Sequence, residues 1–310
     1  GECTIDFCKS EYFAYSVDVY KSWKINMRQM ANCPVDYSLL LDNSLEELKM
    51  SSESGEYGLE NNCIVDIIAD YVTRVGTAVT HSHLSNKKKI LSWMGRIRTE
   101  KAETLEEALQ RILIINQLMW QTRHIQVGFG RMDMILEKYI RDDMSDEYLD
   151  NLLSDFLKVL HSYYWLKSEE MPGDTGQIII LGGVNCNNNL VCNRITYSFI
   201  RAIKKCKLPD PKILLRVTSD TPDELWKIAI DCIATGIGSP LISNDDMAVT
   251  KLIEFGYNEE DARNYTTSAC WELIPGNCCE QNNIGVFDWA TPFDLIGKKE
   301  NLDELDTWDK

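Results

Sequence analysis

The pattern of apolar and polar residues predicts mostly helices in the first third of the chain. Apolar residues recur at helical spacing over 64–79. A polar stretch over 50–62, rich in Ser, Gly and Glu, interrupts this pattern and is predicted to be a loop. The next helix is predicted over 105–121, where Thr104 and Glu107 have the spacing of a capping box. Because its apolar residues lie on nearly all sides, we expect this helix to be buried.

After residue 176 the pattern alternates between short apolar runs and amphipathic stretches. Such alternation predicts parallel strands with helices outside them, and hence an α/β fold. Thr221, followed by Pro222, and Asn244 are predicted helix N-caps, and Gly256 is predicted to end a helix. The predicted strands are 178–181, 212–217 and 240–242, and the predicted helices of the second part are 132–140, 145–165, 190–205, 221–234, 244–255 and 258–265.

Composition and charge exclude several classes of protein. Apolar residues make up 44% of the chain and charged residues 26%, as in soluble globular proteins. No apolar run approaches the roughly 20 residues that span a bilayer, and no secretory signal is seen, so we expect a cytoplasmic protein that does not bind membranes. A net charge of −16 argues against nucleic-acid binding. The 11 cysteines, an odd number, indicate free thiols.

The segment 265–272 carries the candidate chemistry. Small and polar residues lead to Cys270, and Glu272 follows two positions later, so in an extended loop both side chains face the same way. A thiol can exchange a hydrogen atom and a carboxylate can move a proton. A small buried cysteine beside an unrelated acid is the alternative. A metal site on Cys270, Cys278 and Cys279 lacks the CxxC pairs typical of zinc, so no metal is expected.

Five segments, taken in order, resemble the central region of pyruvate formate-lyase-like glycyl radical enzymes. Each segment alone is a weak match, and their shared order makes the resemblance specific. They are Gly128-Phe129-Gly130-Arg131-Met132-Asp133, Leu181-Gly182-Gly183-Val184, Pro209 to Arg216, Gly236-Ile237-Gly238-Ser239-Pro240 with Asn244-Asp245-Asp246, and Gly256 to Glu272.

The resemblance implies a ten-stranded α/β barrel built from two half-barrels, with the catalytic cysteine on a loop inside it. It implies that Cys270 carries a thiyl radical that abstracts hydrogen from a small-molecule substrate. No cofactor is bound: a separate S-adenosylmethionine radical activase installs a glycyl radical, which oxidises the cysteine. It further implies a homodimer when the enzyme is complete.

The residues around Cys270 favour one branch of the family. Formate C-acetyltransferase uses two adjacent cysteines at this loop, whereas Ala269 and Trp271 flank Cys270 here. Cys270-x-Glu272 resembles the branch that eliminates water or amines, or decarboxylates, with the glutamate as acid and base. Formate C-acetyltransferase stays open as an alternative.

Only 40 residues follow Cys270 in this sequence (310 − 270), and none of their glycines lies in an Arg-Val-x-Gly-Tyr type motif. We therefore expect a helical N-terminal region at 1–103 and half of the ten-stranded barrel at 104–310, with the C-terminal glycyl radical domain missing. Truncation, a natural split completed in trans, and an inactive remnant are all open. A lone half-barrel is also expected to leave an apolar inner face uncovered.

For the substrate, the resemblance points to the residues just before the Gly130-Arg131 signature. By position these are His124, Ile125 and Gln126. The Gln126 amide offers both a donor and an acceptor for a hydroxyl or carboxylate group. The alternative is a helix end packed in the core.

Overall fold

The computed structural model describes residues 30–52, 58–121, 127–162, 176–268, 271–276 and 281–283. The chain separates into two compact units, of which one comprises residues 31–281 and the other the two ends, 1–30 and 282–310. Nearly all described residues belong to the first unit, and the elements below are those of that unit with the few residues that adjoin it.

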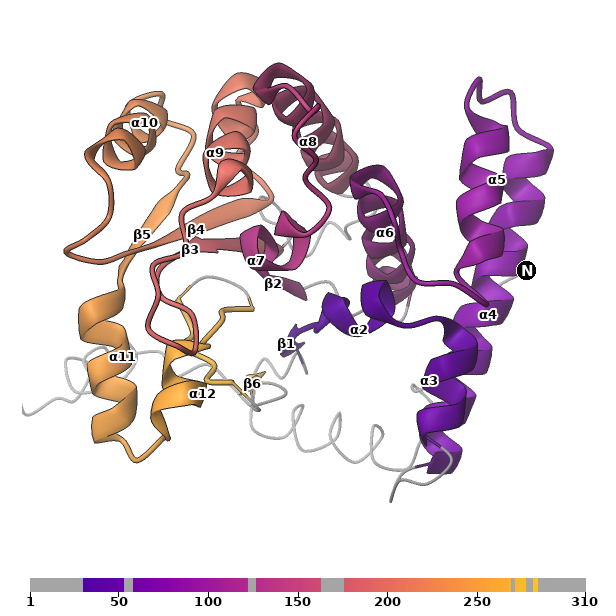
Figure 1. The fold of residues 1–310 in the computed structure, drawn as a ribbon, viewed down its shortest axis with the longest axis horizontal. Coiled ribbons are helices and arrows are strands. Elements are labelled where there is room, and N and C mark those ends of the chain that lie inside the picture. Colours follow the sequence, from indigo (N-terminus) through magenta and orange to yellow (C-terminus); the bar gives the residue numbers. More distant parts are fainter. Residues whose placement is uncertain are drawn as a thin grey trace, which may run out of the picture. The chain divides into compact units, whose positions relative to one another are not determined.

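A parallel sheet forms the centre of the first unit (Figure 1). Its strands β1 to β5 lie in the order β5-β4-β3-β2-β1, and each neighbouring pair is parallel. Chain order equals spatial order, which is how a barrel wall is built up strand by strand. The strands are β1 (Met30–Pro34), β2 (Val127–Arg131), β3 (Ile178–Gly182), β4 (Lys212–Val217) and β5 (Leu241–Asn244), and β6 (Gln281–Asn283) follows near the end of the described residues.

Helices cover the outer face of this sheet. In Figure 1, α8, α9 and α10 lie together over β3, β4 and β5, while α11 and α12 lie on the opposite side of these strands. Ring contacts join the outer face to its helices, from Phe129 of β2 to Phe156 of α8 and on to Phe199 of α9. The helices of this part are α6 (Leu105–Gln121), α7 (Met132–Glu137), α8 (Asp146–Ser162), α9 (Arg194–Cys206), α10 (Asp223–Ile233), α11 (Asp245–Glu254) and α12 (Glu259–Arg263).

The described residues between 30 and 103 are mostly helical, as the apolar spacing predicts. Its helices are α2 (Tyr37–Asp42), α3 (Leu45–Ser52), α4 (Gly58–Thr80) and α5 (Lys87–Arg96). The loop predicted over 50–62 is wrong at both ends, because α3 continues to Ser52 and α4 begins at Gly58. Glu60, Asn61 and Asn62 are compatible with a helix when Val65, Ile68 and Val72 of the same helix are buried. Residues 53–57 lie outside the described part.

Strands β1 and β2 were not predicted, and they pair with one another. The sheet therefore uses residues from both sides of the division expected at residue 103. Strands β3, β4 and β5 lie at or near their predicted positions. Helix α6 and strand β4 have the predicted bounds, and the predicted burial of α6 is confirmed by Leu105, Ala108, Ile112 and Ile114, all at most 1% exposed.

The caps agree with the sequence in part. The Asn244 and Asn258 side chains accept backbone N–H groups at the starts of α11 and α12, and Gly256 follows α11 with a φ of +100°. Thr221 does not cap α10: its hydroxyl accepts from the Thr218 N–H, and Pro222 occupies the cap position. At α6, Thr104 accepts from the Glu107 N–H as predicted, but the Glu107 carboxylate turns to Glu103 N and Arg111.

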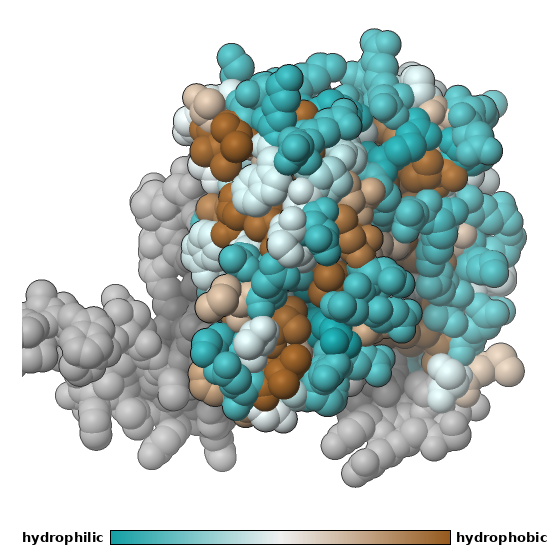
Figure 2. Space-filling view, turned by 60° about the vertical axis from the view of Figure 1, so that its left-hand side comes forward, coloured by the Kyte–Doolittle hydropathy of each residue, from teal (hydrophilic) through white to brown (hydrophobic). Residues whose placement is uncertain are grey.

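The expectation of an uncovered apolar inner face is wrong. Ile178 and Ile180 of β3 and Leu214 of β4 face the side opposite the outer helices and have no exposed surface. Figure 2 views the part of the molecule at the left of Figure 1, where both α10 and α11 lie. Apolar side chains form patches between polar ones on this surface, and Ile230, Met247 and Phe255 are more than half exposed. Within the described residues, no helix is long and apolar enough to cross a membrane.

Candidate active site

Four buried ionic side chains gather where the strands end at their carboxyl edge. Arg131 closes β2, Arg216 lies near the end of β4, and Asp133 and Asp245 lie in the first turns of α7 and α11. The carboxyl ends of parallel strands share one edge of the sheet, which is the usual place for a ligand site in α/β folds. All four residues are at most 4% exposed.

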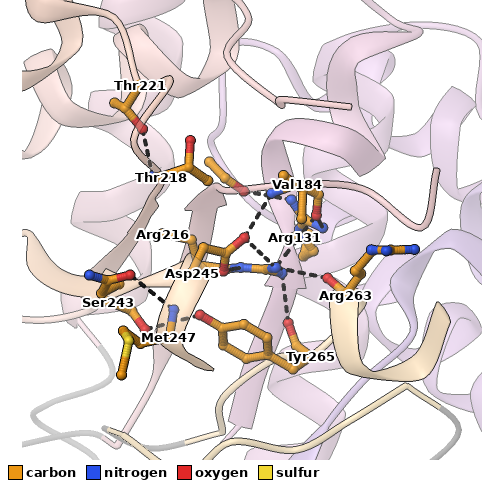
Figure 3. Close-up of polar contacts among 12 residues, drawn as sticks. Arg131, Val184, Arg216, Thr218, Thr221, Ser243, Asp245, Met247, Arg263 and Tyr265 are labelled. Atoms are coloured by element: carbon orange, nitrogen blue, oxygen red, sulfur yellow. Dashed lines mark hydrogen bonds and ion pairs between the residues drawn. The ribbon is translucent and has the colours of Figure 1, made fainter. Parts of the chain in front are cut away.

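Arg216 and Asp245 form a bidentate ion pair at the centre of this cluster (Figure 3). Arg216 Nε lies 2.6 Å from Asp245 Oδ1, and Nη2 lies 2.9 Å from Oδ2. Asp245 Oδ2 also accepts from the Val184 N–H at 2.8 Å. The two charges satisfy one another inside the protein, as buried ions must.

Arg216 also holds the segment that leads into the cysteine loop. Its Nη1 donates to the Tyr265 carbonyl at 3.0 Å and its Nη2 to the Arg263 carbonyl at 2.8 Å (Figure 3). The guanidinium lies over the Tyr265 ring, 3.9 Å from its centroid. The Tyr265 hydroxyl lies 2.9 Å from Ser243 Oγ of β5, and burial raises the pKa of Tyr265 to about 12. Tyr265 is thus held by Arg216 of β4 and by Ser243 of β5.

Arg131 and Asp133, the other two ionic residues, both bind the backbone at the end of β3. Arg131 donates from Nη1 to the Val184 carbonyl and from Nη2 to the Gly182 carbonyl, both at 2.5 Å. Burial lowers the pKa of Arg131 to about 10, with the charge of Arg216 acting in the same direction. Asp133 Oδ2 accepts from the Gly182 N–H at 2.6 Å. Burial raises the pKa of Asp133, against the opposing effect of Arg131.

The glycines of the Gly182-Gly183 pair are required by this packing. Both have φ near +74°, where a side chain is strained. A Cβ on Gly183 would lie 2.6 Å from Asp245 Oδ2 and 2.7 Å from Arg216 Nε. The pair therefore lets the chain pass directly beside the Arg216–Asp245 ion pair.

The loop that contains Cys270 in the sequence is closed at its base. Thr266 and Ile274 exchange two backbone hydrogen bonds, of 2.8 and 2.9 Å, which enclose residues 267–273. The start of this loop lies against β2, where a Cβ on Gly128 would come within 2.3 Å of the Thr267 carbonyl oxygen. Thr267 and Ser268 are fully buried. The two described ends of this loop are therefore fixed to each other, and its first residues lie against the sheet.

Of the residues predicted from sequence, the structure describes Glu272. It is partly exposed, between the exposed Trp271 and Leu273, and Ile274 beyond them is buried. Glu272 and Ile274 thus alternate with the exposed side chains, as in an extended segment with one inward face. Cys270, Cys278 and Cys279 lie outside the described residues, and so do His124, Ile125 and Gln126.

Sequence reasoning placed Arg131, Arg216, Asp245 and Tyr265 inside matching segments but gave them no role. A signal was present: Arg216 directly follows the apolar run Ile213-Leu214-Leu215, and a charge there must be paired when the strand is buried. Among the described residues, no three His, Cys, Asp or Glu side chains lie together as metal ligands would.

Comparison with known proteins identifies the family. The profile of the pyruvate formate lyase-like family matches residues 68–296, which is well over half of the chain. The chain belongs to the pyruvate formate lyase-like family of glycyl radical enzymes, as the five segments predict.

The similar curated proteins are glycyl radical dehydratases and lyases. The chain is 24% identical over 269 residues to the (2S)-3-sulfopropanediol dehydratase of Klebsiella oxytoca, with 77% of this chain and 32% of that protein covered. It is 26% identical over 192 residues to the trans-4-hydroxy-L-proline dehydratase of Clostridioides difficile, with 57% and 24% covered. The chain therefore spans about a quarter to a third of the length of these relatives.

Solved structures show the same fold. The B12-independent glycerol dehydratase of Clostridium butyricum, in its glycerol-bound form, is 19% identical with a TM-score of 0.66, over 86% of this chain and 38% of that one. A glycyl radical enzyme of Archaeoglobus fulgidus is also 19% identical, with a TM-score of 0.67 over 86% and 39%. The parallel sheet described above is thus part of a barrel of this type, as predicted.

Proposed function

We propose that the chain is the central part of a glycyl radical lyase or dehydratase, in which Cys270 carries the thiyl radical and Glu272 moves the proton. The anchoring of the segment before Cys270 carries this proposal. Arg216 holds the carbonyls of Arg263 and Tyr265, and the Thr266–Ile274 pair closes the loop. A radical that must meet one C–H bond needs such a fixed loop.

In the proposed reaction, Cys270 takes and returns the hydrogen atom, and Glu272 transfers the proton. The Cys270 thiyl takes a hydrogen atom from a substrate carbon, which forms S–H and leaves a carbon radical. Glu272 carries a proton from the hydroxyl on that carbon to the neighbouring leaving group, so that water or an amine departs. The product radical then takes the hydrogen atom back from Cys270. A glycyl radical, installed by a separate activase, would supply the initial oxidation of the thiol.

The complete enzyme would also need a glycyl loop, the second half of the barrel and a substrate. The glycyl loop and the second half of the barrel come from further residues of the same polypeptide or from a second one. We expect the complete enzyme to be a homodimer in the cytoplasm that takes a small-molecule substrate.

The test uses the intact protein, activated without oxygen by its activase. The panel contains propane-1,2-diol, glycerol, trans-4-hydroxy-L-proline and (2S)-3-sulfopropanediol, because proteins similar to this chain act on or bind such compounds. We expect one compound of this kind to lose water. Acetyl-CoA formation from pyruvate and coenzyme A would instead support formate C-acetyltransferase. Failure of the activase to install a glycyl radical in the intact protein, with every compound unchanged, would support the inactive remnant.

Glu272→Gln separates the two roles. Glutamine keeps the size of the side chain but cannot carry the proton, so we expect elimination to fall by about 100-fold or more. Exchange of hydrogen between substrate and Cys270 does not need that proton and should persist. Elimination at the wild-type rate in Glu272→Gln would remove the glutamate from the mechanism.

A further inference from the structure

A pocket opens between the end of α7 and the start of α9, two helices that lie side by side (Figure 1). Its volume is about 460 Å³, and pockets for small molecules have about 300–1,000 Å³. Neither Cys270 nor Glu272 is among the residues that line it, so its occupancy does not depend on the proposed reaction. The lining of this α7–α9 pocket consists of Glu137, Ile140, Cys192, Asn193, Arg194 and Tyr197.

Of the two charged side chains in the lining, one is already neutralised. Arg194 lies 3.0 Å through Nε and 2.7 Å through Nη2 from Asp146 Oδ1, and its Nη2 also donates to the Met144 carbonyl. Glu137 is exposed, and its carboxylate has no ion pair or hydrogen bond with any other described residue. The pocket therefore contains one negative charge that the protein does not balance.

The two other titratable groups of the lining are neutral near pH 7. Burial raises the pKa of Tyr197 to about 12, and the charge of Glu224 on α10 acts in the same direction. Burial also raises the pKa of the Cys192 thiol, with the charges of Asp133 and Glu224 adding to the effect. Negative charges thus act on this wall from outside the pocket, so the pocket attracts cations and repels anions.

The lining suits an organic cation better than a metal ion. Metal ions need several oxygen, nitrogen or sulfur ligands, and among the described residues no three His, Cys, Asp or Glu side chains lie together. Ile140 and the Tyr197 ring instead offer apolar surface beside the Glu137 carboxylate. A carbon chain would gain from that surface, while an ammonium group would pair with the carboxylate.

We propose that the α7–α9 pocket binds a small organic ammonium ion, whose charge pairs with Glu137 and whose carbon chain lies against Ile140 and Tyr197. The bound ion would also lie against Asn193, whose side chain donates to the Asp133 carbonyl at 3.0 Å. Asp133 Oδ2 in turn accepts the N–H of Gly182 at the end of β3. The ligand would therefore lie next to the buried ionic cluster without being part of it.

The test uses three probes of similar chain length that differ in the charge of the head group. The intact, unactivated protein is treated with iodoacetamide in the presence of butylammonium, butan-1-ol or butyrate, and mass spectrometry follows the alkylation of Cys192. Cys186 is the internal control, because it is also partly exposed but does not line the pocket. Butylammonium at saturation should slow the alkylation of Cys192 by about 3-fold or more and leave Cys186 unchanged. At the same concentration the alcohol and the carboxylate should protect neither thiol.

Glu137→Gln tests the charge that would hold the ligand. The substitution keeps the size of the side chain and removes its charge, so butylammonium should bind about 3- to 10-fold more weakly, as read from the concentration that protects Cys192. Glu46→Gln is the matched control, because Glu46 is also an exposed acid without an ion pair among the described residues, but it lies in α3. The control should bind as the wild type does. Both positions are exposed, so neither variant should change the unfolding temperature of the ligand-free protein.

Each of three results would overturn the site. The first is no slowing of Cys192 alkylation by butylammonium, or an equal slowing at Cys186. The second is equal protection by butylammonium and butan-1-ol, which would remove the charge from recognition. The third is binding in Glu137→Gln that matches the Glu46→Gln control, which would mean that the carboxylate does not hold the cation.

Discussion

Arg216 and Asp245 are paired through both carboxylate oxygens, at 2.6 and 2.9 Å, and neither side chain is more than 1% exposed. The pair joins β4 to the first turn of α11, and through Arg216 it also holds Tyr265 ahead of the cysteine loop. The stability of the fold and the position of the loop therefore depend on the same two residues.

Asp245→Asn should strongly destabilise the protein. It leaves the Arg216 charge buried without its counter-ion, and such a loss costs about 3–5 kcal/mol. The free energy of unfolding, from urea titration at neutral pH, measures the effect. Glu254→Gln is the control, because it breaks the ion pair with Lys251, in which both side chains are more than half exposed. That change should cost less than about 1 kcal/mol, and equal costs for the two variants would contradict the account.

Gly128→Ala should displace the cysteine loop. Its Cβ would lie 2.3 Å from the Thr267 carbonyl oxygen and 3.0 Å from the Ser268 Cα, both backbone atoms that cannot rotate away. We expect a loss of about 1–3 kcal/mol in the free energy of unfolding. Turnover per mole of folded, activated enzyme should also fall.

Gly95→Ala is the control for this substitution. Gly95 lies in α5, and a Cβ there would meet no atom within 4 Å apart from its chain neighbours and the backbone of its own helix. Alanine in a helix is favoured over glycine by about 0.5–1 kcal/mol, so this variant should be more stable than the wild type. A Gly128→Ala protein as stable and as active as Gly95→Ala would show that β2 does not position the loop.

Tyr265 should make stability fall with rising pH above about 10. In the unfolded chain the phenol ionises near pH 10, whereas burial raises its pKa to about 12 in the fold. Between these values only the unfolded state loses the proton, so rising pH favours unfolding. Below pH 10 the phenol is protonated in both states and contributes no slope.

The difference between wild type and Tyr265→Phe isolates this effect. Loss of the contact with Ser243 Oγ gives a constant offset, and the other titrating groups cancel. Urea unfolding from pH 8 to pH 11 should show the wild type losing up to about 1.4 kcal/mol per pH unit relative to the variant, only above pH 10. A difference that stays flat across the whole range would mean that Tyr265 is not held in its neutral form.

The fold was predictable wherever the apolar pattern was local. Strand β4 and helix α6 have the predicted bounds because each carries its own apolar run and its own end signals. Strand β1 was missed because its five residues, Met30–Pro34, include a proline and no apolar alternation. The start of α4 was missed because its polar first turn is held by burial later in the same helix.

The site was predictable only as a set of segments. The order of the five matching segments predicts Cys270 and Glu272 as site residues, yet it assigns no partner to any side chain. The contacts of Arg216 reach residues 29 to 49 positions away in sequence, namely Asp245, Arg263 and Tyr265. Such pairings follow from the packing of strands and helices, and no local pattern encodes them.

The most direct test of the central claim is hydrogen exchange in the intact protein with Cys270→Ser. Wild type and variant are activated without oxygen, and electron paramagnetic resonance measures the glycyl radical in each. Both are then given a substrate that the wild type turns over, labelled with deuterium at the reacting carbon. We predict equal radical content, with turnover and loss of deuterium from that carbon in the wild type alone. Turnover or loss of substrate deuterium in Cys270→Ser would contradict the assignment of the thiyl radical to Cys270.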